Sequence, residues 1–288
     1  MTARPPTRAD AAEIVELVCA CDVEEYGAPD YDEDALLSEW AEPGVDLEQD
    51  GFVLAGEDGR IAAYGLLLGE DARAWVHPQA RGQGFGTRLA ELLEARAKHR
   101  GTAALAQQVA ASNAAARALL EGRGYTLTRA YAHLTLPAER AAALPEPAGV
   151  RRIDVSTTAE LADAEAVQAV IAARFGAAGF RYEPLDAVLG RDPDTSLWFV
   201  AQDGRSGAIR AELRDGDQGW ISEVAVGEAA AGRGLGAALV TAAARALAAR
   251  GARSVGLSVR STNEGALRLY RRLGFDGDWD VEELTKQL

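Results

Sequence analysis

Two glycine-rich segments of this 288-residue chain have the residue types and spacing of an anion-binding site. Residues 81–86 read Arg-Gly-Gln-Gly-Phe-Gly and residues 231–236 read Ala-Gly-Arg-Gly-Leu-Gly, each between a predicted strand and a predicted helix. The start of a helix offers unpaired N–H groups and partial positive charge, and glycine lets a phosphate come close to the backbone. The alternative is that these glycines only form turns. Neither segment continues as a Walker loop or as a dinucleotide-binding β-α-β unit.

A second motif follows each glycine-rich segment at a fixed distance. In the second half of the chain, Asn263, Ala266, Leu267 and Tyr270 fall on one face of a predicted helix, and Gly274 is placed to cap it. Core packing explains the alanine and the leucine. It explains the Asn amide and the Tyr hydroxyl less well, because buried polar groups need hydrogen-bond partners. The asparagine also suits an N-cap position.

The chain is an internal duplication of one domain. Gly84 and Gly234 are 150 residues apart, and Asn113 and Asn263 have the same separation. Four further pairs keep this offset: Ala116 with Ala266, Leu119 with Leu269, Gly124 with Gly274, and Tyr125 with Phe275. A repeat of this length indicates two domains and not a solenoid. The proline-containing seam at 136–150 predicts domains at 1–140 and 151–288, with a linker at 141–150.

Each copy is predicted to contain the same elements in the same order. A helix (8–21 and 158–175) precedes a hairpin, and a further strand (72–76 and 219–226) leads into the glycine loop. A long helix (87–99 and 237–250), a strand, the helix of the second motif and a short closing strand follow. This order indicates an α+β fold class, with a central mixed sheet flanked by helices in each domain.

The composition indicates a folded, acidic protein. Hydrophobic residues make up 48%, charged residues 26%, and the net charge is -14. The acidic balance argues against nucleic acid as a partner, and no stretch approaches the roughly 20 apolar residues of a membrane-spanning helix. The start of the chain lacks the apolar core of a signal peptide, and the spacing of Cys19 and Cys21 does not suit a disulfide, so we expect a cytoplasmic protein. No metal site is predicted, because His, Cys and carboxylate residues do not cluster at ligand spacing.

The two motifs together resemble the GNAT acyltransferase superfamily, in the tandem two-domain type of mycothiol synthases and related actinobacterial acetyltransferases. The resemblance covers nearly the whole chain. In that family the glycine motif holds the pyrophosphate of acetyl-CoA, and the Asn-x-x-Ala-x-x-Leu-Tyr helix lies beside its pantetheine and thioester. The resemblance implies acetyl-CoA as cofactor and assigns to it, in the second copy, Val224, Ala225, Val226, Ala231, Gly232, Arg233, Gly234, Leu235, Gly236, Ala237 and Asn263. In the first copy it assigns Val76, Arg81, Gly82, Gln83, Gly84, Phe85, Gly86, Thr87 and Asn113.

The copies differ where the resemblance places the chemistry. Tyr270 matches the family's general acid, which protonates the leaving coenzyme A thiolate, whereas the first copy has Leu120. Glu223 lies on the strand where many members carry a general base, whereas the first copy has Arg73. A base or a water chain is required because an alkylammonium is mostly protonated at neutral pH. We therefore expect the second domain to be the catalytic one.

The phosphate loops differ in the opposite sense. The first copy keeps Arg81 of the motif, whereas the second has Ala231 and offers Arg233 as the nearest replacement for the charge. The first domain is then either a second acyl-CoA site without turnover or a structural partner.

The resemblance implies acetyl-CoA-dependent N-acetylation of a primary amine on a small molecule, by direct attack in a ternary complex. An amino-sugar thiol precursor and an amine-bearing antibiotic are the candidate acceptors, and residues 179–185 and 214–218 are candidates for contacting them. One alternative is a non-catalytic acyl-CoA-binding or sensor protein, because each copy lacks one element of the motifs. Another is catalysis in the N-terminal domain. The fusion of two domains favours a monomer.

Overall fold

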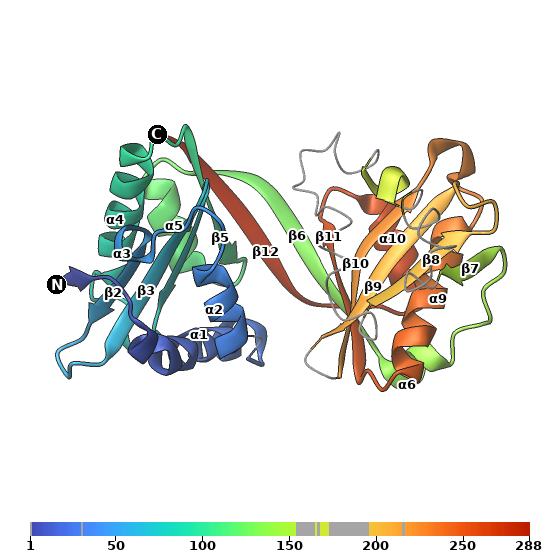
Figure 1. The fold of residues 1–288 in the computed structure, drawn as a ribbon, viewed down its shortest axis with the longest axis horizontal. Helices are drawn as coiled ribbons and strands as arrows, with labels where there is room; N and C mark the ends of the chain where they lie inside the picture. The colour runs from blue at the N-terminus through green and yellow to red at the C-terminus, as the bar shows by residue number, and fades with distance from the viewer. Residues whose placement is uncertain (1, 30, 154–164, 166–167, 173–195, 215–216) are drawn as a thin grey trace. The chain divides into compact units, whose positions relative to one another are not determined.

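The computed structural model describes residues 2–29, 31–153, 165, 168–172, 196–214 and 217–288. They form two compact units, the first comprising Met1–Tyr131 and Trp279–Leu288 and the second Ala132–Asp278. In each unit helices pack on a mixed β-sheet (Figure 1), so the α+β class expected from the sequence is confirmed.

The sheet of the first unit has the strand order β1-β2-β3-β4-β5-β12. Strand β3 is buried along its whole length, because helix α1 packs on one face and helix α4 on the other. β4 and β5 are parallel, whereas the other neighbours are antiparallel. The strands are β1 (Ala3–Arg4), β2 (Gly51–Ala55), β3 (Ile61–Leu68), β4 (Asp71–Val76), β5 (Ala104–Ala110) and β12 (Asp276–Gln287). The helices are η1 (Arg8–Asp10), α1 (Ala11–Tyr26), α2 (Glu33–Trp40), α3 (Leu47–Asp50), η2 (Pro78–Ala80), α4 (Phe85–His99) and α5 (Ala114–Gly122).

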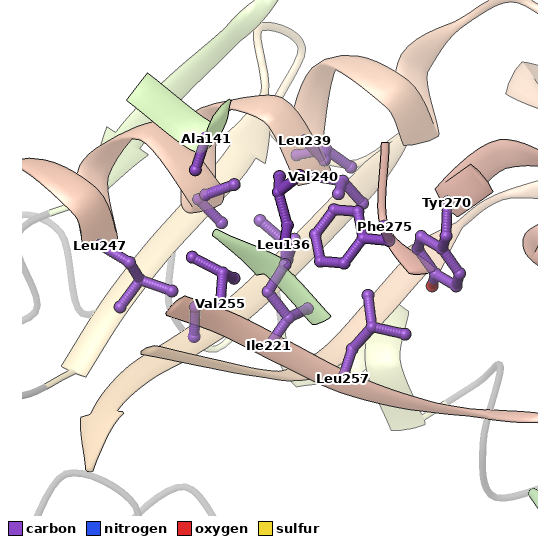
Figure 2. Close-up of a cluster of buried hydrophobic side chains, with 14 of the residues drawn as sticks. Leu136, Ala141, Ile221, Leu239, Val240, Leu247, Val255, Leu257, Tyr270 and Phe275 are labelled. Carbon is purple, nitrogen blue, oxygen red and sulfur yellow. The ribbon is translucent and has the colours of Figure 1, made fainter. Parts of the chain in front are cut away.

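The sheet of the second unit has the order β6-β11-β10-β9-β8-β7. The Ala- and Leu-rich helix α9 buries Leu239, Val240 and Leu247 against this sheet, beside Ile221 and Leu257 (Figure 2). Full burial of each large apolar side chain contributes about 1.5–3 kcal/mol. The strands are β6 (Thr126–Pro137), β7 (Val150–Ile153), β8 (Ser196–Ala201), β9 (Gly207–Arg214), β10 (Gln218–Val226) and β11 (Ser254–Arg260). The helices of this unit that the structure describes from end to end are α6 (Ala138–Ala142), η4 (Glu228–Ala230), α9 (Leu235–Ala249) and α10 (Glu264–Leu273).

The final strand of each copy completes the sheet of the other unit. Residues 281–287 of β12, drawn in red in Figure 1, pair antiparallel with β5. In return, β6 brings Leu134 and Leu136, both fully buried, into the core of the second unit. The sequence predicted a short closing strand within each copy, whereas both strands are 12 residues long and exchanged. The residue pattern of a strand shows that it is a strand but does not specify the edge with which it pairs.

The expected linker is partly folded into the second unit. Ala141 of α6 is fully buried in its core, and Arg245 Nη1 donates to the carbonyl of Ala142 at 3.0 Å. Because of this helix and the strand exchange, the compact units differ from the domain boundaries 1–140 and 151–288. The predicted helix 158–175 lies largely outside the described residues.

In the described part of the chain, no helix combines the length and the apolar character needed to cross a membrane. The same residues contain no group of three or more His, Cys, Asp or Glu side chains that could hold a metal ion. Cys19 and Cys21 are free thiols.

Candidate active site

The glycine-rich loop of the second unit leaves the start of α9 open. Gly232 and Gly234 have φ angles of +75° and +84°, a backbone region that favours glycine, and Gly234 is the N-cap of the helix. A Cβ added at either glycine would meet no atom within 4 Å. The N–H of Ala238 donates to the carbonyl of Gly234 at 3.1 Å, so the earlier amides of this turn are not used by the helix. The loop therefore offers amides, partial positive charge and room for an anion.

Three elements converge at this loop. A Cβ at Gly236 in the first turn of α9 would lie 3.4 Å from the side chain of Leu269 on α10 and 3.7 Å from that of Val226 at the end of β10. The structure thus brings together the strand, the loop and the second helix that the sequence motifs identified separately.

Strand β10 loses its parallel neighbour before it reaches the loop. Its described pairs with β11 run from Gln218 to Trp220, whereas its pairs with β9 continue to Val226. A register shift between Ile221 and Glu223 makes a β-bulge on the β9 side at the same place. The edge of β10 from Ile221 onward therefore carries peptide groups that the described ladder with β11 does not use. Such an edge can bind an extended ligand that has amide groups of its own.

Tyr270 of α10 is a buried phenol. Its side chain is 7% exposed and packs edge-on against Phe275, with ring centroids 5.9 Å apart (Figure 2). Val224 and Val226 of β10 belong to the same hydrophobic core cluster, and Leu269, the residue before Tyr270, lies with Val226 beside Gly236. Burial raises the pKa of Tyr270 to about 12, because the phenolate loses its hydration there. The side chain is therefore a neutral proton donor at physiological pH.

Glu223 forms a cross-strand ion pair. Its Oε2 lies 3.0 Å from Nε of Arg210, the residue opposite it on β9, and both side chains are largely buried. This arginine was not identified from the sequence as the partner of Glu223. A glutamate in such a pair is held in place, and one carboxylate oxygen faces the guanidinium.

The first unit has the same loop conformation but different side chains. Gly82 and Gly84 have φ angles of +77° and +88°, close to those of their counterparts in the second unit. Leu120, at the position of Tyr270, is a core residue that cannot donate a proton. Arg73, at the position of Glu223, pairs with Glu39 at 2.9 Å. The chemical groups expected of the second unit are therefore missing from the first.

The other predicted residues occupy corresponding places in the two units. Asn113 is the N-cap of α5, and its side chain accepts the N–H of Ala116 at 3.0 Å. Asn263 is the N-cap of α10 and accepts the N–H of Ala266 at 3.2 Å. Gly274 caps the end of α10 with a φ of +92°. The capping roles predicted for Asn263 and Gly274 are confirmed. Ala225 lies in β10, and Val76 ends β4. The loops hold Ala231, Arg233, Arg81 and Gln83, and the first helical turns hold Leu235, Gly236, Ala237, Phe85, Gly86 and Thr87. Residues 179–185, a candidate for acceptor contact, lie outside the described residues.

Comparison with known proteins gives concordant matches. The family model described as the acetyltransferase (GNAT) family matches residues 11–125 and 165–275. A mycothiol acetyltransferase of Nocardioides sp. is 31% identical over 254 residues, covering 77% of this chain and 83% of that protein. A mycothiol acetyltransferase of Mycolicibacterium gilvum is 31% identical over 296 residues, covering 92% of this chain and 91% of that protein.

Solved structures with the same architecture span the whole chain. A GCN5-related N-acetyltransferase from Sphaerobacter thermophilus has a TM-score of 0.80 at 29% identity, covering 99% of this chain and 95% of that chain. A tandem GNAT protein from the clavulanic acid biosynthesis pathway has a TM-score of 0.74, covering 99% and 98%. Its identity is 18%, so this second likeness concerns the fold alone.

Proposed function

This chain belongs to the acetyltransferase (GNAT) family, and we propose that it transfers an acetyl group from acetyl-CoA to a primary amine of a small molecule, with the chemistry in its second unit. The observation that carries the proposal is the buried phenol of Tyr270, which stands where the first unit has Leu120. With a pKa of about 12, this phenol keeps its proton until it is needed.

The open start of α9 supports the second unit as the cofactor site. Gly232 and Gly234 leave room for a diphosphate beside amides that the helix does not use. Arg233 is exposed and adds a positive charge where Ala231 has none, and Asn263 is exposed at the start of α10. The residues assigned to this site are Val224, Ala225, Val226, Ala231, Gly232, Arg233, Gly234, Leu235, Gly236, Ala237 and Asn263.

The proposed reaction is direct transfer in a ternary complex. Bound acetyl-CoA supplies an acyl carbon activated as a thioester, and the products are an amide and the free thiol. A backbone N–H near Ala225 or Val226 would stabilise the negative charge that develops on the acyl oxygen. Tyr270 donates its phenolic proton to the departing sulfur as the carbon–sulfur bond breaks. The proton lost by the attacking amine passes through Glu223 or water to solvent, and the Tyr270 phenolate then takes a proton from solvent, which restores the phenol.

The ion pair with Arg210 favours a specific role for Glu223. The guanidinium stabilises the carboxylate in its charged form, which suits an oxygen that holds an ammonium group and accepts its proton in passing. We therefore propose that Glu223 binds and orients the acceptor amine and relays its proton, with water as the final base.

The relatives indicate which acceptor to test first. Two of them, each 31% identical, are named mycothiol acetyltransferase, so we propose the amine of a mycothiol precursor as the first candidate. An amine-bearing antibiotic is the second. Both are small amines, and we propose the cytoplasm as the location of the enzyme.

The exchanged strands bear on the oligomeric state. β12 and β6 fill sheet positions within one chain. This supports the proposal that the enzyme acts as a monomer.

Release of free thiol from acetyl-CoA, measured with a panel of amines, tests the proposal. Tyr270→Phe should lower kcat by roughly 10²–10⁴-fold, the usual contribution of one general acid, and leave the Kd for acetyl-CoA unchanged. Tyr125→Phe, which removes a buried phenol from the first unit, is the matched control and should retain turnover. Unchanged turnover in Tyr270→Phe would remove this residue from the mechanism.

A non-catalytic acyl-CoA sensor is the second candidate function. It is motivated by Leu120 in one unit and Ala231 in the other, since each unit lacks one element of the motifs. Tight binding of acetyl-CoA without thiol release from any amine would favour the sensor over the enzyme.

A further inference from the structure

Helix α1 of the first unit contacts residues with which that unit is expected to bind a cofactor. Val76, Arg81 and Asn113 come from the end of β4, the glycine loop and the start of α5, and all three bond to the last two turns of α1. Cys21 Sγ donates to the carbonyl of Val76 at 3.3 Å. Glu25 accepts hydrogen bonds from both Arg81 and Asn113. One helix therefore engages all three elements of the expected site.

The carboxylate of Glu25 joins the two motifs of the first unit. Its Oε1 accepts from Arg81 Nη2 at 2.8 Å and from Asn113 Nδ2 at 2.5 Å. Its side chain is 14% exposed. Glu24 places a second, mostly exposed carboxylate 3.2 Å from Arg81 Nη1. The guanidinium that would neutralise a pyrophosphate is thus already neutralised from within the chain.

An incoming diphosphate would meet charge of its own sign at this loop. To reach Arg81 it would have to displace Glu25 and leave that carboxylate buried without its partners. Burial raises the pKa of Glu25 and outweighs the opposing effects of Asn113 and Arg81, so the carboxylate depends on these partners to stay ionised. Displacement therefore breaks the ion pair and leaves a buried carboxylate with nothing to replace its lost hydration.

The second unit presents its corresponding groups differently. Its loop has nearly the same φ angles, but Ala231 carries no charge to pair with a carboxylate. Asn263 is exposed, whereas Asn113 is half-buried against Glu25. The described difference between the two loops lies in side chains and not in backbone conformation.

We propose that α1 closes the cofactor site of the first unit, with the Glu25 carboxylate in the place of the ligand's anion, and that one chain binds a single acetyl-CoA. The contribution of the first unit is then structural, because its half of the chain supplies β6 to the core of the second unit. The inference rests on the proposed function for the choice of acetyl-CoA as the probe.

Hydrogen exchange measured by mass spectrometry on the full chain tests this proposal, because it reports on each loop separately. Saturating acetyl-CoA should protect the amides of residues 232–238 and leave those of residues 82–88 unchanged. In Glu25→Gln and Glu25→Ala, both segments should be protected, and equilibrium dialysis should find two bound ligands per chain where the wild type has one. Removing one close like charge should tighten binding at the first loop by at least about tenfold. Glu24→Gln, which alters the exposed carboxylate on the same arginine, should stay at one ligand.

Each outcome bears on one of the two proposals. Protection of residues 82–88 in the wild type overturns the closed site, and so does a folded Glu25 variant that still binds one ligand. If both Glu25 variants fail to fold, the wild-type protection pattern still decides between one site and two. Absence of protection at residues 232–238 instead overturns the proposed function of the second unit. Protection of residues 82–88 that appears only in the Glu25 variants supports the closed site even in that case.

Discussion

Replacing Tyr270 with phenylalanine should make the second unit more resistant to alkaline unfolding than the wild type. Burial raises the pKa of this phenol from 10.0 to about 12. Between these values the unfolded chain ionises at Tyr270 and the folded chain does not, which favours unfolding. The contribution of the neutral Tyr270 phenol to the free energy of unfolding is therefore complete below pH ~10 and is lost as the pH rises from there through ~12. Phenylalanine keeps the ring beside Phe275 and cannot ionise.

The size of the effect follows from the pKa difference. Each pH unit between the two values changes the free energy of unfolding by about 1.4 kcal/mol. The wild type should therefore lose about 1.4 kcal/mol at pH ~11 through this residue, and at most roughly 2.7 kcal/mol above pH ~12. At pH ~8 both states are neutral, and this contribution is absent.

Guanidinium unfolding followed by circular dichroism, at pH ~8 and pH ~11, measures this difference for both proteins. Wild type and variant share all other ionisable groups. The change with pH in the difference between their free energies of unfolding therefore isolates Tyr270. If the free energies of unfolding of variant and wild type differed by the same amount at pH ~8 and pH ~11, the phenol would ionise at its ordinary pKa. It would then be accessible to water, and the argument for a proton donor protected by burial would fail.

Two further perturbations test the loops and the strand exchange. Gly234→Ala should weaken acetyl-CoA binding by roughly tenfold or more in calorimetric titration. The alanine adds a Cβ where we place the diphosphate, and holding it at a φ of +84° costs about 1–2 kcal/mol of backbone strain. Gly84→Ala should lower the stability of the first unit by a similar amount and leave the affinity for acetyl-CoA unchanged. Residues 132–278 expressed alone should show a cooperative thermal transition, whereas residues 151–288 should not. The second fragment lacks Leu134 and Leu136, and removing one such side chain from a core lowers the free energy of unfolding by about 2–5 kcal/mol. A cooperative transition in the latter fragment would show that the exchanged strand is dispensable.

The duplication and the order of the main elements could be predicted because they depend on local signals. The glycine loops, the Asn caps and the glycine that ends α10 each act within a few residues, so the sequence reveals them directly. The strand exchange could not be predicted in this way. β6 and β12 have the residues of strands, but their partners are chosen by contacts across the sequence, such as the pairing of Val281 with Ala110.

The candidate site was predictable to the same extent. The loop and Tyr270 follow from motif and spacing, whereas the charged partners around them come from distant parts of the chain. Arg81 meets Glu25 across 56 residues, and Glu25 meets Asn113 across 88. Arg210 is recognisable only in retrospect, as a charged residue at a buried position of β9. A single sequence contains these charges but does not say which of them pair.

The unit with the more complete phosphate motif is, on our proposal, the one that does not bind the cofactor, and the physical reason lies in the arginine itself. A guanidinium binds any anion that reaches it, and a carboxylate on the same chain is present at a high effective concentration. Arg81 is therefore satisfied by Glu25 without a ligand, and the unit gains from this pair some of the electrostatic stabilisation that a diphosphate would supply. The loop with Ala231 relies on backbone amides at the start of α9, and it carries no arginine at that position to attract an internal carboxylate. Retention of a charged motif residue in a duplicated domain is thus compatible with loss of the ligand, and the alanine at position 231 is compatible with its retention.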